Sequence, residues 1–260
     1  NDRMRELSLK LPVDSDIQIV IRFIEQSALY YAQVRGLGTL KLNSTKEYIE
    51  KYTEEFYLVD LYYRRTLEAY HELITKENPI EQTLSDAKRQ LDLEYAKITN
   101  VLNLEWLTCV GEKGAWFTET GLKRQEDFYK NESDTSVKQV VIVCDALRYE
   151  VAKELMQELA KEKHIATIDA YQAMLPTETK YCKPALLPHH SLELNGTDMM
   201  VDGTLLTTTE QRTAHLGKYR EGAICMRYED VMNGDAQSMR ELFKRPLVYI
   251  FYDTIDEAGH

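Results

Sequence analysis

The sequence predicts an α/β domain with a mainly parallel sheet and flanking helices, preceded by an all-helical domain. Up to about residue 110, apolar side chains recur at helical spacing and glycine is rare. From Val137 onward, short β-branched runs alternate with helical segments, a pattern typical of parallel sheets with right-handed crossovers. A polar run at 131–136 separates the two patterns. We therefore predict a helical domain over 1–132 and an α/β domain over 133–260.

The composition indicates a folded chain without a membrane partner. The 260 residues are 43% hydrophobic, which suffices for a core, and no run approaches the roughly 18 apolar residues of a membrane helix. The net charge of −11 argues against this part binding a nucleic-acid backbone alone. Four cysteines without a C-x-x-C pair favour a reducing, cytoplasmic location. Because the first residue is Asn and the last lies in a motif, we interpret the chain as a piece of a longer protein.

Three helices are expected in the first half. The first has N-caps in Asp14 and Asp16 and ends near Gly36. The second begins at Ser44, ends at Asn78-Pro79, and is followed by a third helix toward Leu102. The second helix carries one aromatic stripe, which we expect to pack in a core rather than bind a ligand: Tyr48, Tyr52, Phe56, Val59, Tyr63, Leu67 and Tyr70.

Three strands and one long helix are expected in the second half. The run 140–144 has no polar alternation, which predicts a strand buried on both faces. A helix over 147–163 follows, then strands over 164–168 and 247–252. Ligands bind at the carboxyl ends of parallel strands.

Polar residues follow these predicted strands, and this clustering is the first functional signal. Asp145 either caps the next helix or serves as a metal ligand or phosphoryl acceptor. Thr177 and Thr179 offer a helix cap or a nucleophile, and a threonine hydroxyl needs a base or a metal to react at neutral pH. Asp253 and Asp256 follow the last strand, and Asp256 belongs to a D-x-x-G-H motif whose His260 can reach the same divalent ion.

The order of these motifs resembles the alkaline phosphatase superfamily, and more narrowly the PglZ family of bacterial phage-exclusion (BREX) systems. The resemblance is dense over 137–260 and looser over 40–130, where Phe56-Tyr57, Val59-Asp60 and Tyr63-Arg64 are similar to the region before the family's core. Its motifs are VVIVCDALRYEVA, MLPTETK with ALLPH, VDG and VYIFYDTIDEAGH.

The resemblance implies a two-metal site with a threonine nucleophile. Thr179 would be that nucleophile, with Thr177 left open, and Asp145 would hold the first ion. Asp256 and His260 would hold the second. Lys180 and Arg148 are candidates for binding the substrate phosphate. The ions would be zinc or manganese, and we expect this chain alone to hold them weakly or not at all and to be inactive, because the family's remaining ligands follow later in sequence. His189, His190 and His215 match none of those ligands and are interpreted as surface or turn residues.

The implied function is that of an anti-phage defence protein with a phosphatase or phosphodiesterase core. Its partners would be other components of a phage-exclusion complex, and its substrate a phosphate ester such as a nucleotide or nucleic acid. The alternative is a scaffold or interaction module with a non-catalytic core. A third hypothesis, a phospho-acceptor domain of the receiver or haloacid-dehalogenase type, is disfavoured because Ala146 and Leu147 follow Asp145 where the latter type needs D-x-D.

Overall fold

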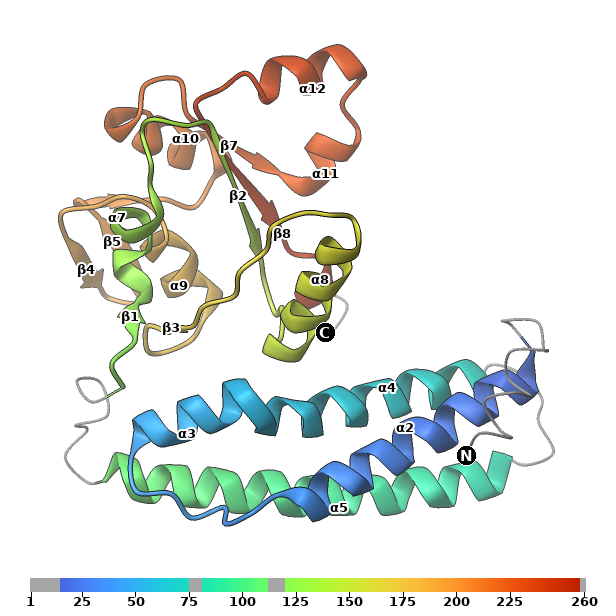
Figure 1. Cartoon of the computed structure of the whole chain (residues 1–260). Coiled ribbons are helices and arrows are strands. Elements are labelled where there is room, and N and C mark those ends of the chain that lie inside the picture. The colour runs from blue at the N-terminus through green and yellow to red at the C-terminus, as the bar shows by residue number, and fades with distance from the viewer. Residues whose placement is uncertain (1–14, 75–80, 112–119, 258–260) are drawn as a thin grey trace. The chain divides into compact units, whose positions relative to one another are not determined.

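The predicted fold class is confirmed, with a helical region followed by parallel sheets and flanking helices. The computed structural model describes residues 15–74, 81–111 and 120–257 (Figure 1). Two compact units make up the chain: a helical unit of Asn1–Gly121 with Tyr149–Ala166, and an α/β unit of Leu122–Arg148 with Thr167–His260. The predicted domains, 1–132 and 133–260, stay a prediction. The compact units differ from them because the segment 149–166 groups with the helices.

The helical unit contains five α-helices and one π-helical turn among its described residues. They are α2 (Asp16–Gly36), α3 (Thr45–Lys51), the π-helical turn η1 (Tyr52–Phe56), α4 (Tyr57–Ile74), α5 (Glu81–Val110) and α8 (Tyr149–Lys161). The cap expected at Asp14 or Asp16 is wrong for Asp16, and Asp14 lies outside the described residues. Ser15 caps α2 instead, accepting a hydrogen bond from the Gln18 amide, while Asp16 lies in the first turn, where its charge favours the helix dipole.

The aromatic stripe packs in the core, as predicted. Tyr48, Phe56 and Val59 are buried, and the ring of Tyr63 stacks on that of Tyr95 with centroids 3.8 Å apart. Ser44 caps α3 as expected, but the second helix is interrupted by the π-helical turn. The expected end at Asn78-Pro79 lies outside the described residues, and the third helix runs past Leu102 to Val110.

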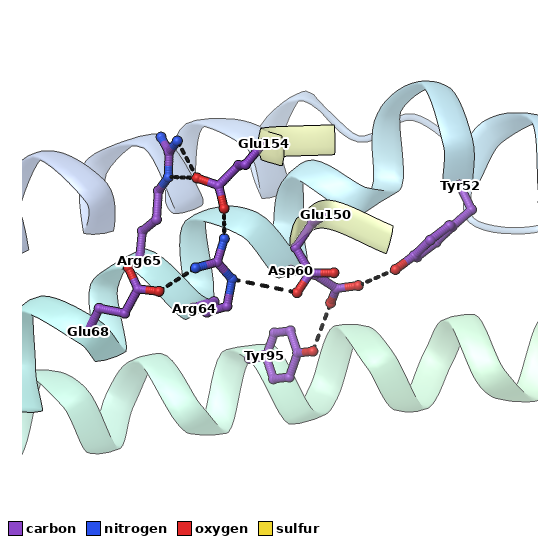
Figure 2. A network of polar contacts seen from close by, with 8 residues as sticks. All are labelled: Tyr52, Asp60, Arg64, Arg65, Glu68, Tyr95, Glu150 and Glu154. Atoms are coloured by element: carbon purple, nitrogen blue, oxygen red, sulfur yellow. Dashed lines mark hydrogen bonds and ion pairs between the residues drawn. The ribbon is translucent and has the colours of Figure 1, made fainter. Parts of the chain in front are cut away.

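Asp60 on α4 joins three segments of the helical unit (Figure 2). One carboxylate oxygen accepts from the hydroxyl of Tyr52 at 2.6 Å, and the other accepts from that of Tyr95 at 2.7 Å. Tyr52 belongs to the π-helical turn and Tyr95 to α5. The carboxylate therefore ties the turn, α4 and α5 together.

A second polar group joins α4 to α8 (Figure 2). Arg64 pairs with Glu68 on its own helix and with Glu154 on α8, and its Nε lies 3.7 Å from Glu150. Arg65 donates to Glu154 at 2.8 Å. The side chain of Glu150 is fully buried, so α8 contributes a buried carboxylate whose charge is offset by Arg64.

The described residues of the α/β unit form three small sheets. The strands β2 (Gln139–Cys144), β8 (Leu247–Tyr252) and β7 (Ile224–Arg227) form a parallel sheet in the order β2-β8-β7. A parallel pair joins β1 (Lys123–Arg124) to β3 (Tyr171–Gln172), and an antiparallel sheet joins β4 (Leu192–Asn195), β5 (Asp198–Val201) and β6 (Thr204–Leu205). The helical segments are η2 (Gln125–Asp127), α7 (Phe128–Glu132), α9 (Thr179–Ala185), α10 (Thr209–Tyr219), α11 (Tyr228–Met232), α12 (Ala236–Leu242) and α13 (Thr254–Glu257).

The central strand β8 is buried on both faces, whereas β2 is not. Tyr249 and Phe251 pack on the side of α10, while Val248 and Ile250 pack against α11 and α12. On β2, Val141 and Val143 join the first cluster, but Val140 and Ile142 are 47% and 59% exposed. The prediction that 140–144 is buried on both faces is therefore wrong, because the face of β2 that carries Val140 and Ile142 belongs to neither of the two clusters that cover β8.

The strand predicted over 164–168 is also wrong. This segment has no regular structure, and Ile165 is fully exposed. Strand propensity is a weak guide without a neighbouring strand or core to pack against. No helix within 15–74, 81–111 and 120–257 combines the length and the apolar composition needed to cross a bilayer.

Candidate functional site

The register of the parallel sheet brings two carboxylates side by side. Cys144 at the end of β2 pairs with Tyr252 at the end of β8, so Asp145 and Asp253 follow at the same edge. The Asp145 amide donates to the Tyr252 carbonyl at 3.0 Å, which extends the ladder by one residue. A parallel sheet collects its strand-end residues at one edge, and here both are acidic.

Helix α9 places a hydroxyl and an ammonium against these carboxylates. Thr179 and Lys183 are four residues apart, so both project from one face of the helix. The Thr179 hydroxyl donates to Asp145 Oδ2 at 3.0 Å. The Lys183 ammonium lies 2.9 Å from the same Oδ2 and 2.5 Å from Asp253 Oδ1.

The electrostatics keep Asp145 ionised. Partial burial would raise the pKa of Asp145, but the hydrogen bond and charge of Lys183, followed by the Thr179 hydroxyl, outweigh burial and lower it. Asp145 Oδ1 also accepts from the amide of Ala146, which has a left-handed backbone with φ of 58°. A non-glycine residue in this region costs about 1–2 kcal/mol, so the turn beside Asp145 is strained.

Arg212 is a second cationic side chain close to this edge. It lies on α10, its guanidinium carbon is 4.8 Å from the ring centre of Phe251, and its Nε donates to the Leu206 carbonyl at 3.3 Å. Burial lowers the pKa of Arg212, while the negative charge of Asp253 acts in the opposite direction. Phe251 is two residues before Asp253, so the two side chains face the same side of the sheet. Arg212, which contacts Phe251, therefore lies on the side of Asp253.

The structure brings together some of the predicted site residues and leaves others apart. Thr179 and Asp145 are in contact, whereas the candidate Lys180 is exposed, pairs with Glu178 at 3.3 Å and lies over the ring of Tyr181. Arg148 and Thr177 are exposed. The roles proposed for these side chains stay predictions.

Asp256 lies on α13, directly after β8, and is partly buried. His260 lies outside the described residues. The interpretation of His215 as a surface or turn residue is wrong: it is buried on α10, with Nε2 2.6 Å from the Pro188 carbonyl. His190 is exposed and His189 partly buried.

Lys183 and Arg212 were missed in the sequence analysis. The spacing of Thr179 and Lys183 on a helix was visible, but it gained meaning only once the register of β2 and β8 was known. Asp253 was noted as a strand-end residue without a role. Nothing local to Arg212 indicates that its side chain reaches β8.

The donors around Asp145 fit a divalent cation. Within the described part of the chain, no group of three or more His, Cys, Asp or Glu side chains is arranged to hold a metal ion. A carboxylate and a hydroxyl nevertheless meet at Asp145 Oδ2, and oxygen donors of this kind suit divalent ions. The Lys183 ammonium is a stand-in cation, showing that positive charge is accommodated between Asp145 and Asp253.

A carboxylate, a hydroxyl and a buried ammonium thus meet at the carboxyl edge of a parallel sheet in an α/β domain, where such sheets bind ligands. Residues 126–260 match a family model described as the BREX system PglZ alkaline phosphatase-like domain. The chain belongs to the PglZ family.

Two curated relatives are similar to this chain. An alkaline phosphatase-like protein PglZ from Bacillus cereus (strain H3081.97) is 28% identical over 250 residues, covering 90% of this chain and 29% of the relative. An alkaline phosphatase-like protein BrxZ from Escherichia coli O9:H4 (strain HS) is 33% identical over 150 residues, covering 54% of this chain and 17% of the relative. The chain thus spans less than a third of the length of these relatives. No solved structure matches it significantly.

Proposed function

We propose that the full-length protein hydrolyses phosphate esters with Thr179 as the nucleophile, and acts with other components of a phage-exclusion system. The carrying observation is the 3.0 Å hydrogen bond from Thr179 to Asp145 at the carboxyl edge of two paired parallel strands. Family membership supports the same chemistry.

Thr179 needs a cation to react. Asp145 orients the hydroxyl, but a carboxylate with a lowered pKa is a weak base and cannot take the threonine proton at neutral pH on its own. A divalent ion held by Asp145 and Thr179 would lower the pKa of the hydroxyl and polarise the phosphate. Asp256 and His260 are the proposed ligands of a second ion, and we expect the 260-residue chain alone to bind both ions weakly.

The chain's own residues then account for the displacement. The Thr179 hydroxyl releases its proton to solvent and its oxygen forms a bond to phosphorus. The bond from phosphorus to the leaving oxygen breaks, and the leaving oxygen takes up a proton from solvent. Water hydrolyses the resulting phosphothreonine and restores the hydroxyl. Arg212, with Lys180 and Arg148 as further candidates, supplies positive charge for the phosphate oxygens.

Thr179→Ala and Thr177→Ala form a matched pair for the test, because both threonines are exposed and lie in one short segment. Full-length protein loaded with zinc or manganese would be assayed on nitrophenyl phosphate mono- and diesters. Thr179→Ala should lower kcat on the order of 10³-fold or more, while Thr177→Ala should retain most of the activity.

Other outcomes identify a different function. Equal loss in both variants would contradict the assignment of Thr179. No turnover in the wild-type protein, with fold and metal binding intact, would support the scaffold function instead. The ratio of monoester to diester turnover would define the substrate class.

A further inference from the structure

We propose that Asp145 and Asp253 form one cation-binding position, and that Lys183 is a tethered cation that competes with a divalent ion for it. This inference deepens the proposed function and rests on it, since it assumes that the site binds metal. Asp253 then becomes a ligand beside Asp145 and Thr179, and Lys183 sets how tightly the ion is held.

The first support is the sheet register. Asp145 and Asp253 follow the paired residues Cys144 and Tyr252, so their backbones are held adjacent. Two carboxylates at such a spacing repel each other unless a cation lies between them. The Lys183 ammonium occupies that position, at 2.9 Å from one carboxylate and 2.5 Å from the other.

The second support is the burial of Lys183. Its side chain is 8% exposed, whereas that of Lys180, on the same helix, is 50% exposed and pairs only with its neighbour Glu178 among the ion pairs described. A buried ammonium is costly unless it is paired, so Lys183 depends on these two carboxylates. It is attached to α9, which makes its local concentration at the site high.

The third support is the sharing of one oxygen. Asp145 Oδ2 accepts from both Thr179 and Lys183, so an ion that contacts Thr179 and Asp145 meets the ammonium at the same atom. Two cations at one carboxylate oxygen repel each other strongly in a partly buried site. Divalent ion and ammonium therefore exclude each other, and the ion binds only when Lys183 moves away.

The test is manganese binding to the full-length protein, measured by isothermal titration calorimetry without any substrate. Lys183→Met, an unbranched side chain close to lysine in length but without its charge, should tighten manganese binding at the position between Asp145 and Asp253 at least about tenfold. Lys183→Arg keeps the charge and should give no gain. Lys218→Met, an exposed lysine of α10 in the same unit, should leave both dissociation constants unchanged.

A double variant assigns the gain to the proposed ligand. Asp253→Asn combined with Lys183→Met should lose most of the tightening. If Lys183→Met folds poorly by circular dichroism, Lys183→Gln makes the same test and should give the same gain. Unchanged or weaker manganese binding in the folded uncharged variant would overturn the competition while leaving a metal-dependent hydrolase intact. Absence of manganese binding in both the wild type and Lys183→Met would instead overturn the metal-dependent function and this inference with it.

Discussion

Asp202 shows how a single carboxylate stabilises a turn away from the candidate site. It has a left-handed backbone with φ of 49° and accepts hydrogen bonds from the amides of His190 and Ser191 and from the hydroxyl of Tyr219. Burial would raise the pKa of Asp202, but the Tyr219 hydroxyl and the two amides outweigh it and lower the pKa to about 2. The ionised form therefore holds β5, α10 and the segment before β4 together.

The lowered pKa makes part of the stability pH-dependent. A carboxyl group with a pKa of about 2 when folded and about 3.9 when unfolded stabilises the folded state above pH ~4. That contribution is lost as the pH falls through the folded pKa. Asp202→Asn keeps the shape and tolerates the left-handed backbone.

We expect Asp202→Asn to lower the free energy of unfolding by about 1–2 kcal/mol at pH 7, after allowance for solvent screening. The difference from wild type should shrink between pH 4 and pH 2. Urea unfolding of the 260-residue chain at several pH values measures both. Asp198→Asn, an exposed aspartate of the same hairpin, is the control and should change little at any pH. A deficit of Asp202→Asn that does not depend on pH would contradict the role of its charge.

At the scale of elements, α8 depends on α4 through charge. Glu150 is fully buried and Arg64 is the cation described beside it, while Glu154 pairs with both Arg64 and Arg65. Removing one partner of a buried pair leaves the other charge less compensated, which is costlier than losing an exposed pair. The surface pair of Arg22 and Glu72 offers the comparison, since both side chains are more than 40% exposed.

Arg64→Met should destabilise the helical unit by about 3–5 kcal/mol. Arg22→Met should cost no more than about 1 kcal/mol. Thermal unfolding followed by circular dichroism at 222 nm, with hydrogen exchange of α8 and α5 amides, separates the two. Equal effects of the two substitutions would show that burial of Glu150 does not control the stability of α8.

Some of the helices and strands could be predicted from the sequence and others could not. The helices predicted from strong apolar periodicity were found. The prediction of β8 was also correct, because a long β-branched and aromatic run specifies a buried strand wherever it packs. The strand prediction for 164–168 was wrong, since a short apolar run needs a neighbouring strand to become a strand itself. The predicted burial of Ile142 was also wrong, because burial on the second face of β2 depends on elements outside the run itself.

At the scale of the whole molecule, the candidate site was predicted in part. The order of Asp145, Thr179 and Asp256 could be read from motifs, and the first two are in contact. Lys183 could not be predicted in the same way, because its partners follow two strands separated by more than a hundred residues. Only the register of β2 with β8 reveals that Asp145 and Asp253 are neighbours.

The match to the family model begins at residue 126, after the helices α2 to α5 and the arginines that pair with α8. A chain of 126–260 would therefore contain Glu150 and Glu154 without Arg64 and Arg65. We expect its α8 to be cleaved by protease faster than in the 260-residue chain. Adding residues 15–110 in trans should restore protection. Equal cleavage rates in both chains would contradict this expectation.

The pairing of α8 with α4 also limits how the two parts of these proteins can be recombined between relatives. A chimera that joins the N-terminal helices of one relative to the phosphatase-like domain of another would separate Arg64 from Glu150 and Glu154, with which it pairs in this chain. Recombination at the apparent boundary should therefore be disfavoured unless both sides preserve the charge pairing. The alignment with the Bacillus cereus relative, which covers 90% of this chain, is in line with the two parts having been inherited as one piece.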